Sequence, residues 1–515
     1  MTNAVQTALS AVASSVNAPP DEVAKSVEAT SDWLSTFTAW VDTIDGYVWG
    51  VPLTASILVT GLLLTCVLRF SHLFNLKNAF RYMFHQEGDG AHGEVSQFGA
   101  LCTALSATIG TGNIVGVATA IGTGGPGALF WMEVAAFFGM ATKYAEGLLA
   151  VKYREVLPDK RILGGPFYYI EKGLGPKWKP LAFAFAFFGA IAGIMGIGTI
   201  AQIHGITSAV QRFFDPGFNP ADMSTGLQVF GTTYSTSVVV SGMIVTLCVG
   251  LVVIGGLKRI AKVSTVVVPF MAVFYLIVIA FLLLGNLSKI TAAFELIVRA
   301  AFNPSAFTGG MVGSIFIAMQ KGIARGIFSN EAGLGSAPIA AAAARTNEPV
   351  RQGLVCMTGT FIDTIVICTM TGLAIVVTGA WEPSLGLKGV DITIEAFSRG
   401  LSFLGPHSSV LAGFFLMTAL AFFAYTTILG WDYYSERCLE YLVGPKRGWI
   451  VKVFRFAYVA VVFIGPYLTV SAVWGIADVF NGLMAFPNLV ALVLLSPVVY
   501  RTSKEFFDRH SAAKP

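Results

Sequence analysis

Charged side chains are scarce in this chain of 515 residues. Asp, Glu, Lys and Arg together make up 12% of it, about half the roughly 25% found in soluble domains. Hydrophobic residues make up 55%, and the mean hydropathy is +0.71. So few charges cannot cover a soluble surface of this size, and a disordered chain would be more polar. The composition therefore predicts a polytopic, all-α membrane protein with a lipid-solvated exterior.

Motifs for covalent or metal chemistry are also missing. The six cysteines lie singly, without a CxxC pair, and the six histidines form no HExxH, which argues against a disulfide or zinc framework. No GxxxxGK[ST] loop is present, so we expect no ATP-driven step. The net charge of +4 is small and dispersed, which gives no reason to expect a nucleic-acid partner. We expect neither an enzyme nor a resident cofactor.

Eleven apolar stretches are long enough to cross a bilayer, which takes about 20 residues. They lie near 46–70, 97–122, 127–151, 181–212, 236–257, 262–285, 308–344, 353–378, 408–436, 452–470 and 473–500. Residues 1–45 lack a basic segment followed by an apolar one, so we interpret them as a polar leader and not as a signal peptide. Residues 501–515 form a charged tail.

The distribution of Lys and Arg predicts the orientation. If the N-terminus is outside, 24 of the 33 basic residues fall in inside segments, six fall outside and three lie within spans. Positively charged loops stay in the cytoplasm. The bias therefore predicts an inner-membrane protein with an outside N-terminus, a cytoplasmic C-terminus and an odd number of spans.

Two of the expected spans are interrupted by polar residues and glycines. The span at 97–122 contains the run TIGTGN at residues 108–113, and the span at 308–344 contains GIFSNEAGLG at 326–335. The alternative for the first is close helix packing through small residues, and the alternative for the second is a loop between two half-length helices. We favour unwound segments at membrane depth.

The two interrupted spans lie five spans apart and run in opposite directions. Residues 97–285 and 308–500 can therefore form two five-helix repeats of inverted orientation, with 46–70 as an extra helix. Half-helix N-termini suit a carboxylate, and freed carbonyl groups suit an ammonium group or a sodium ion. The pattern predicts a midplane site for a zwitterion and a co-transported cation.

Long motifs in the chain resemble a known family. They are GTGNIVGVATAI (110–121), GGPGALFWM (124–132), FFGMATKYAE (137–146), ARGIFSNEAGLGSAPIAAAAA (324–344) and GTFIDTIVICTMTG (359–372). They resemble the sodium:alanine symporter family, also called the alanine or glycine:cation symporters, and the resemblance covers nearly all of 46–500. It implies a leucine-transporter-like fold with one extra N-terminal helix, and sodium-driven uptake of alanine, glycine or a similar small neutral amino acid.

The resemblance also implies roles at the first interruption. It assigns substrate carboxylate binding to Thr108, Gly110, Thr111, Gly112 and Asn113. Gly110 and Asn113 are expected to contribute to sodium binding as well.

At the second interruption, the resemblance points to Ser329, Asn330 and Glu331. These residues would recognise the substrate ammonium group or hold the unwound backbone. Glu331 has a further alternative, because it could pair with Arg325 or cap the second half-helix.

Further along the chain, the resemblance favours contact between Gln202 and the ligand, where the alternative is an amide cross-link between helices. Thr426 and Thr427 would offer hydroxyl groups to sodium. Trp431 lies on the same helix face as Thr427. It would be a pocket wall or gate, or alternatively an aromatic residue at the cytoplasmic interface.

Two carboxylates are candidates for coupling. Asp363 lies about ten residues into its span, so roughly 15 Å deep, and it could neutralise a cation, accept a proton or pair with a basic residue. Glu133 stands where many family members carry a Trp. Lys143 and Glu146, three residues apart, are expected to form an ion pair that reaches toward the cytoplasmic interface.

Three rival functions remain at this point. A proton-coupled carrier would use Asp363 or Glu133 as its titrating group. A channel would require a continuous polar pore, whereas the polar residues here concentrate at two interruptions. An intramembrane enzyme would need a nucleophile and base or metal ligands, which the sequence does not cluster.

Overall fold

The computed structural model describes residues 36–41, 43–85, 91–158, 160–219, 226–230, 232–302, 315–468 and 471–512. Most of the expected leader at 1–45 and the start of the stretch at 308–344 lie outside these residues. The description below refers to the described ranges.

The described chain is almost entirely helical. The longer helices are α3 (Val51–Val67), α5 (Leu76–Phe84), α6 (Gln97–Thr108), α7 (Val115–Gly124), α8 (Gly127–Lys152), α10 (Lys179–Met195), α11 (Ile200–Phe214), α12 (Thr236–Val253), α13 (Leu257–Leu284), α14 (Leu287–Phe302), α15 (Ile315–Asn330), α17 (Pro349–Thr360), α18 (Thr369–Thr378), α19 (Val390–Gly400), α20 (Ser408–Val443), α21 (Gly448–Ile464) and α22 (Ser471–Ala512).

Short elements connect them. They are α4 (Ser71–Phe74), η1 (Thr111–Asn113), α9 (Pro166–Tyr168), η2 (Tyr169–Gly173), η3 (Pro176–Trp178), α16 (Ala337–Ala341), η5 (Phe361–Cys368), η6 (Pro383–Leu385), η7 (Ser402–Leu404) and η8 (Gly465–Tyr467). Two small antiparallel hairpins join β1 (Glu155–Val156) to β2 (Ile162–Leu163) and β3 (Gly226–Val229) to β4 (Thr232–Ser235).

Within the described ranges, nine helices are long and apolar enough to cross a membrane. A tenth span arises if α6 and the stretch Thr111–Gly124, which are bent by 62°, count as one. These ten correspond to ten of the eleven expected stretches. The stretch at 308–344 contains α15 and the five-residue α16, which do not pass the same test. The protein is therefore an all-α membrane protein, and the count of eleven spans stays a prediction.

Local backbone geometry explains both breaks. After α6, Ile109 and Gly110 are extended, with ψ 93° and φ −140° respectively, so the helix cannot continue through them. After α15, Glu331, Gly333 and Gly335 have φ values of 55°, 90° and 81°. Glycine adopts this left-handed region without steric cost, whereas Glu331 is strained there and needs other contacts to hold it.

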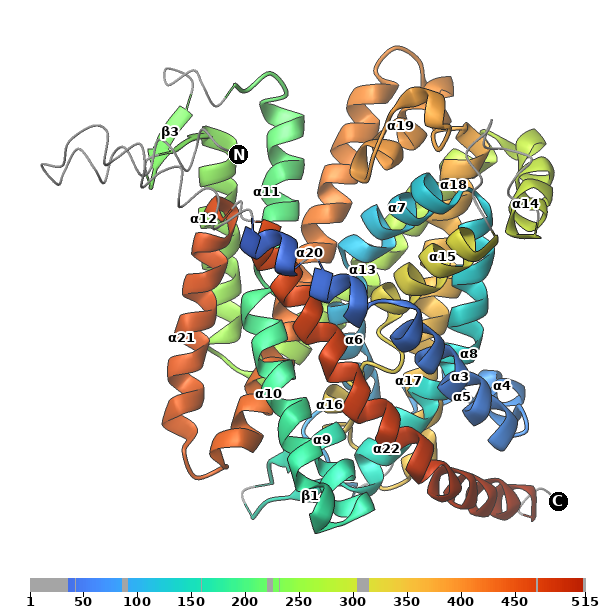
Figure 1. The fold of residues 1–515 in the computed structure, drawn as a ribbon, viewed down its shortest axis with the longest axis vertical. Helices are drawn as coiled ribbons and strands as arrows, with labels where there is room; N and C mark the ends of the chain where they lie inside the picture. Colours follow the sequence, from blue (N-terminus) through green and yellow to red (C-terminus); the bar gives the residue numbers. More distant parts are fainter. Residues whose placement is uncertain are drawn as a thin grey trace, which may run out of the picture.

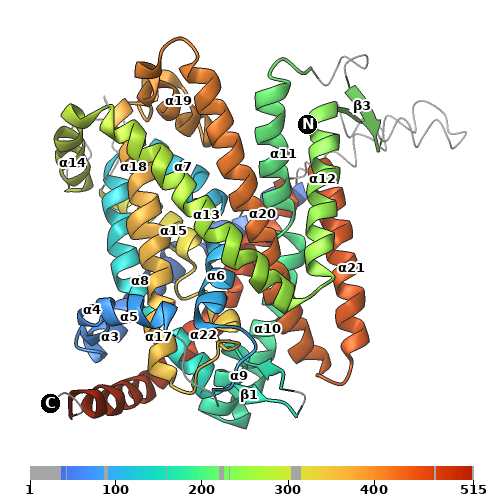
Figure 2. The same cartoon turned by 180° about the vertical axis from the view of Figure 1, so that it is seen from behind.

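Helix α8 is largely buried and packs against α17, α15 and α3. The packing is closest where glycine replaces a side chain. A Cβ atom on Gly147 would lie 2.6 Å from the Cys356 sulfur, and one on Gly353 would lie 2.7 Å from the Tyr144 carbonyl oxygen. Small residues allow such close approach between membrane helices. In Figures 1 and 2, α12 and α21 lie side by side at one flank, and α14 lies at the opposite flank.

One arginine connects the ends of both broken helices. Arg154, just after α8, donates hydrogen bonds to the carbonyl oxygens of Ala342, Ala344, His92 and Thr346 at 2.6–2.8 Å. Residue 92 precedes α6, and 342–346 follow α16. Backbone bonds between 92–95 and 343–346 join the same segments. These contacts close the molecule on the side where α6 begins and α16 ends.

We expect Arg154→Ala to lower the thermal unfolding temperature by several degrees. Hydrogen bonds from a charged donor contribute about 1.5–3 kcal/mol each, and four backbone carbonyl groups lose this donor together. Thermal unfolding of purified protein measures the effect. Lys152→Ala, at an exposed position two residues earlier, is the control. Equal unfolding temperatures for the two variants would contradict the prediction.

Candidate functional site

The first break is held by the side chain of Asn113. Its Oδ1 accepts a hydrogen bond from the Gly110 backbone N–H at 2.9 Å, and its Nδ2 donates to Asp363 Oδ1 at 2.8 Å. Asn113 is fully buried. The amide therefore fixes the extended turn and connects it to another helix.

Asp363 lies in the π-helical segment η5, between α17 and α18. Its Oδ2 accepts hydrogen bonds from Ser329 at 2.9 Å and from Thr364 at 2.8 Å. Together with the bond from Asn113, these contacts join the first break, the end of α15 and η5. Asp363 has no exposed surface, so these donors replace the water that a carboxylate otherwise requires.

The second break is held by its own polar side chains. Asn330 Oδ1 accepts from the Ala332 backbone N–H at 2.9 Å, and Asn330 Nδ2 donates to Thr364 at 3.1 Å. Glu331 accepts from the hydroxyl of Ser336 and from Trp431 Nε1, the latter at 3.1 Å. These bonds stabilise the left-handed backbone at Glu331.

A third buried carboxylate supports the same break from outside it. Glu146 on α8 accepts from the backbone N–H groups of Gly333 and Gly335, both at 3.2 Å, and from Asn488 Nδ2 at 2.7 Å. Lys143 and Glu146 are both buried, and no ion pair joins them among the described residues. The predicted ion pair at the interface is therefore wrong, because Glu146 binds the unwound backbone.

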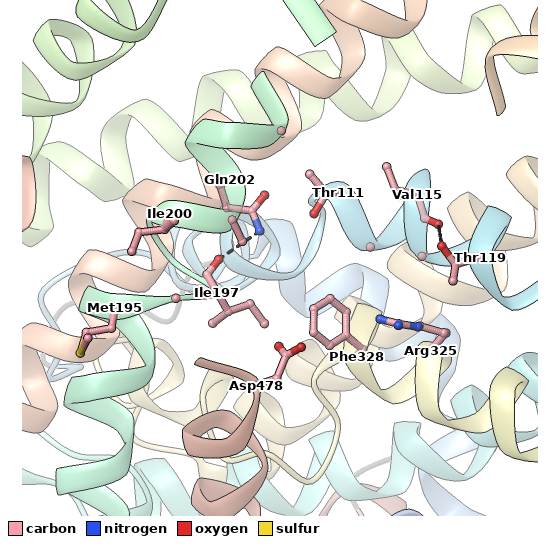
Figure 3. A pocket seen from close by; sticks show the side chains of 15 residues that line it. Thr111, Val115, Thr119, Met195, Ile197, Ile200, Gln202, Arg325, Phe328 and Asp478 are labelled. Carbon is pink, nitrogen blue, oxygen red and sulfur yellow. Dashed lines mark hydrogen bonds between the residues drawn. The ribbon is translucent and has the colours of Figure 1, made fainter. Parts of the chain in front are cut away.

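A cavity of about 300 Å³ lies beside the breaks, at the lower end of the range for small-ligand sites. It is lined by Thr111, Gly112, Val115, Gly116, Thr119, Met195, Gly196, Ile197, Ile200, Ala201, Gln202, Gly205, Arg325, Phe328 and Asp478. Figure 3 shows Thr111 and Gln202 at one end, Asp478 at the other, and the Phe328 ring between them. A Cβ on Gly112 would lie 3.4 Å from Ser329 Cα, so the two breaks are adjacent here.

Gln202, which lines this cavity, carries a buried acceptor without a partner. Its Nε2 donates to the Ile197 carbonyl oxygen at 3.0 Å. Its Oε1 is buried and has no hydrogen-bond partner in the described structure. A buried acceptor without a donor is costly, so a ligand donor at this position would be favourable.

Thr427 lies on the other side of the first break. Its hydroxyl donates to the Phe423 and Ile109 carbonyl oxygens at 3.0 and 3.4 Å, and a Cβ on Gly110 would lie 2.6 Å from it. Thr426 points elsewhere, since its hydroxyl contacts Met271 and the Phe423 carbonyl. The described residues contain no group of three or more His, Cys, Asp or Glu side chains suited to a metal. Carbonyl and hydroxyl oxygens are the available ligands for a hard cation.

The structure thus separates the expected site residues into two groups. Thr111, Gly112 and Gln202 line the cavity. Other residues hold the breaks or lie next to them: Thr108, Gly110, Asn113, Ser329, Asn330, Glu331, Asp363, Thr427 and Trp431. Trp431 is fully buried and bonded to Glu331, so it is not an interface aromatic. Glu133 lies on α8, and its Oε1 is buried without a hydrogen-bond partner in the described structure.

The sequence patterns do not point to Phe328 or Asp478 as cavity residues, nor to Glu146 and Asn488 as the support of the second break. Asp478 had a usable signal, because it is a carboxylate within an expected span. Phe328 had none, since one aromatic in an apolar helix is ordinary. The π-helical segment at 361–368 also carries no distinct sequence signal.

Comparison with known proteins agrees with this architecture. The model of the sodium:alanine symporter family matches residues 34–515. An uncharacterized transporter of Haemophilus influenzae is 50% identical over 475 residues, which cover 92% of this chain and 97% of that protein. The sodium/alanine symporter AgcS of Methanococcus maripaludis is 45% identical over 484 residues, or 93% and 99% of the two chains.

More distant relatives extend the comparison. The probable sodium/glutamine symporter GlnT of Bacillus subtilis is 34% identical over 467 residues, or 91% of this chain and 90% of that protein. The crystal structure of MhsT in complex with L-phenylalanine superposes with a TM-score of 0.53 at 14% identity, covering 80% of this chain and 98% of that one. This likeness concerns the fold alone, which is that of leucine-transporter-like proteins.

The helices that are long and apolar enough to cross a membrane indicate an integral membrane protein. The family match over almost the whole chain is more specific. The chain belongs to the sodium:alanine symporter family.

We expect Asp363→Asn to reduce uptake roughly tenfold or more. In Asp363→Asn, an NH₂ group replaces one of the two carboxylate oxygens that accept these hydrogen bonds, so this NH₂ group would face another donor. An unsatisfied buried donor costs about 1–3 kcal/mol. Initial uptake rates in proteoliposomes measure the effect. Asp508→Asn, at an exposed position on α22, is the matched control. Unchanged uptake by Asp363→Asn would show that the connected breaks do not need this carboxylate.

Proposed function

We propose that this protein is a sodium-coupled symporter that imports a small neutral amino acid, alanine or glycine, across the inner membrane. The observation that carries the proposal is the cavity beside two adjacent helix breaks, whose lining includes Gln202, a side chain with an unpartnered Oε1 atom. The named relatives that are sodium/alanine and sodium/glutamine symporters support the coupling ion and the substrate class.

The proposed substrate orientation follows from the polarity of the cavity walls. The substrate carboxylate binds the backbone N–H groups of Thr111 and Gly112 and the hydroxyl group of Thr111. These residues begin η1, where backbone donors lack intrahelical partners. The ammonium group donates to Gln202 Oε1. Thr108, Gly110 and Asn113 shape this end, and Ser329, Asn330, Glu331 and Trp431 hold the facing break.

The proposed sodium ligands are oxygen atoms at the end of α6. The Ile109 carbonyl group, Gly110 and the Thr427 hydroxyl group lie together there, and Asn113 connects them to Asp363. Thr426 belongs to the same proposal only if its hydroxyl rotates away from Met271. Sodium bound here would stabilise the bent backbone on which the substrate carboxylate depends, which couples the two ligands.

Alternating access follows from two inverted repeats, which we propose at 97–285 and 308–500 with one extra helix before them. The Arg154 contacts close the α6 and α16 ends, whereas the cavity lies on the side of α7 and α15. Rocking of one repeat against the other would open the side held by Arg154 and close the side of the cavity. In this proposal the closed side faces the cytoplasm, with the N-terminus outside and the C-terminus inside, which the distribution of basic loops supports.

Uptake into proteoliposomes, with sodium and proton gradients imposed separately, tests the proposal. We expect saturable alanine or glycine uptake that follows the sodium gradient. Uptake that follows only the proton gradient would support the rival in which Asp363 or Glu133 carries a proton. Non-saturable flux would support a channel. Either outcome contradicts sodium symport.

Gln202→Leu tests the substrate orientation. The change keeps the approximate size of the side chain and removes the acceptor, so we expect KM to rise roughly tenfold while the protein still folds. Gln211→Leu, the same substitution on α11 but outside the cavity lining, is the control. An unchanged KM in Gln202→Leu would remove the ammonium contact from the proposal.

A further inference from the structure

The far wall of the cavity consists of Phe328, Arg325 and Asp478. The Arg325 guanidinium lies 5.6 Å from the centre of the Phe328 ring. Arg325 and the Asp478 carboxylate both line the cavity, although no ion pair within 4 Å joins them in the described structure. Phe328 and Asp478 belong to α15 and α22, so a contact that fixes both would fix the shape of this wall.

Trp49 makes such a contact from outside the proposed repeats. It lies in the apolar helical stretch Thr36–Val67 that precedes them. Its indole Nε1 donates a hydrogen bond of 2.8 Å to the Asp478 backbone carbonyl. Its ring meets the Phe328 ring edge-on, with centroids 6.4 Å apart and an interplanar angle of 63°. Aromatic pairs prefer this geometry, and a buried indole N–H requires an acceptor.

Gly482, four residues after Asp478 on α22, leaves room for Trp49. A Cβ atom on Gly482 would lie 2.4 Å from Val48 Cγ1 and 3.1 Å from Trp49 Nε1. The first distance is too short for real contacts, so a side chain at 482 would force Val48 to shift and would crowd the indole nitrogen of Trp49. Glycine at this position therefore leaves room for the indole beside the Asp478 carbonyl group.

We infer that Trp49 is a positioning residue for the substrate site, and that the extra N-terminal helix sets the shape of the cavity through it. Its hydrogen bond fixes the position of α22 at Asp478, and its ring fixes the rotation of Phe328. The inference rests on the proposed function for its kinetic meaning. The packing itself does not depend on which amino acid is carried.

Uptake kinetics test the inference. We expect Trp49→Phe, which keeps a ring and loses the N–H group, to raise KM for alanine or glycine roughly two- to tenfold with little change in the maximal rate. Gly482→Ala is expected to act in the same direction by displacing the indole. Trp40→Phe is the control, because Trp40 is 68% exposed. Wild-type KM values in both Trp49→Phe and Gly482→Ala would overturn the inference.

A labelling experiment separates this inference from the proposed function. Met195→Cys places a thiol in the cavity lining, and Cys66→Ser and Cys248→Ser remove the exposed native thiols. We expect Trp49→Ala to increase the rate of maleimide labelling at position 195 severalfold. If that rate rises while the wild type takes up no amino acid, the proposed function fails and the positioning role stands. If the labelling rate is unchanged, the positioning role is wrong.

Discussion

The Asp363 carboxylate is the contact on which the interior of this transporter depends. Two unwound segments in the protein interior leave backbone groups without helical partners, and apolar surroundings cannot supply them. Asn113 brings the first break to Asp363, and Ser329 brings the end of α15 to it. One buried acceptor therefore holds both breaks at a fixed separation. The cavity exists because the breaks are adjacent and neither can refold into a continuous helix.

Two other buried carboxylates, Glu331 and Glu146, hold the second break. Glu331 and Glu146 bind the second break from within and from α8. The strained backbone there is thus supported by charge-assisted hydrogen bonds, which are stronger than neutral ones. Since these groups bind the backbone, few side chains with polar groups line the cavity: those of Thr111, Thr119, Gln202, Arg325 and Asp478. Such a sparse polar lining suits a small zwitterion.

The two faces of the molecule differ in how they are closed. Where α6 begins and α16 ends, Arg154 and a short backbone ladder join the segments. On the opposite side, the cavity wall depends on side-chain contacts with the extra helix through Trp49. The hydrogen bonds of Arg154 must break for the first face to open. The Trp49 contacts involve one hydrogen bond and one ring pair, which makes that wall easier to adjust.

The breaks could be located from the sequence because glycine, threonine and asparagine are poor helix formers in an apolar span. Their partners could not be located, because hydrogen bonds such as Asn113 to Asp363 join residues 250 positions apart. Lys143 and Glu146 show the same limit. Their helical spacing predicts an ion pair between them, but in the folded protein Glu146 binds the unwound backbone. Thr426 and Thr427 are adjacent in sequence and face different surroundings.

The sequence by itself determined that the chain is a helical membrane protein with two interrupted spans, because hydropathy and residue type act locally along each helix. It also determined the family, since the motifs are long and specific. Only the tertiary structure decided which polar residues line the cavity and which hold the backbone. It also revealed that Arg325, Phe328, Asp478 and Trp49 meet at the far wall. Which polar residues line the cavity depends on helix rotation and on contacts between distant segments, and periodicity along one helix cannot predict either.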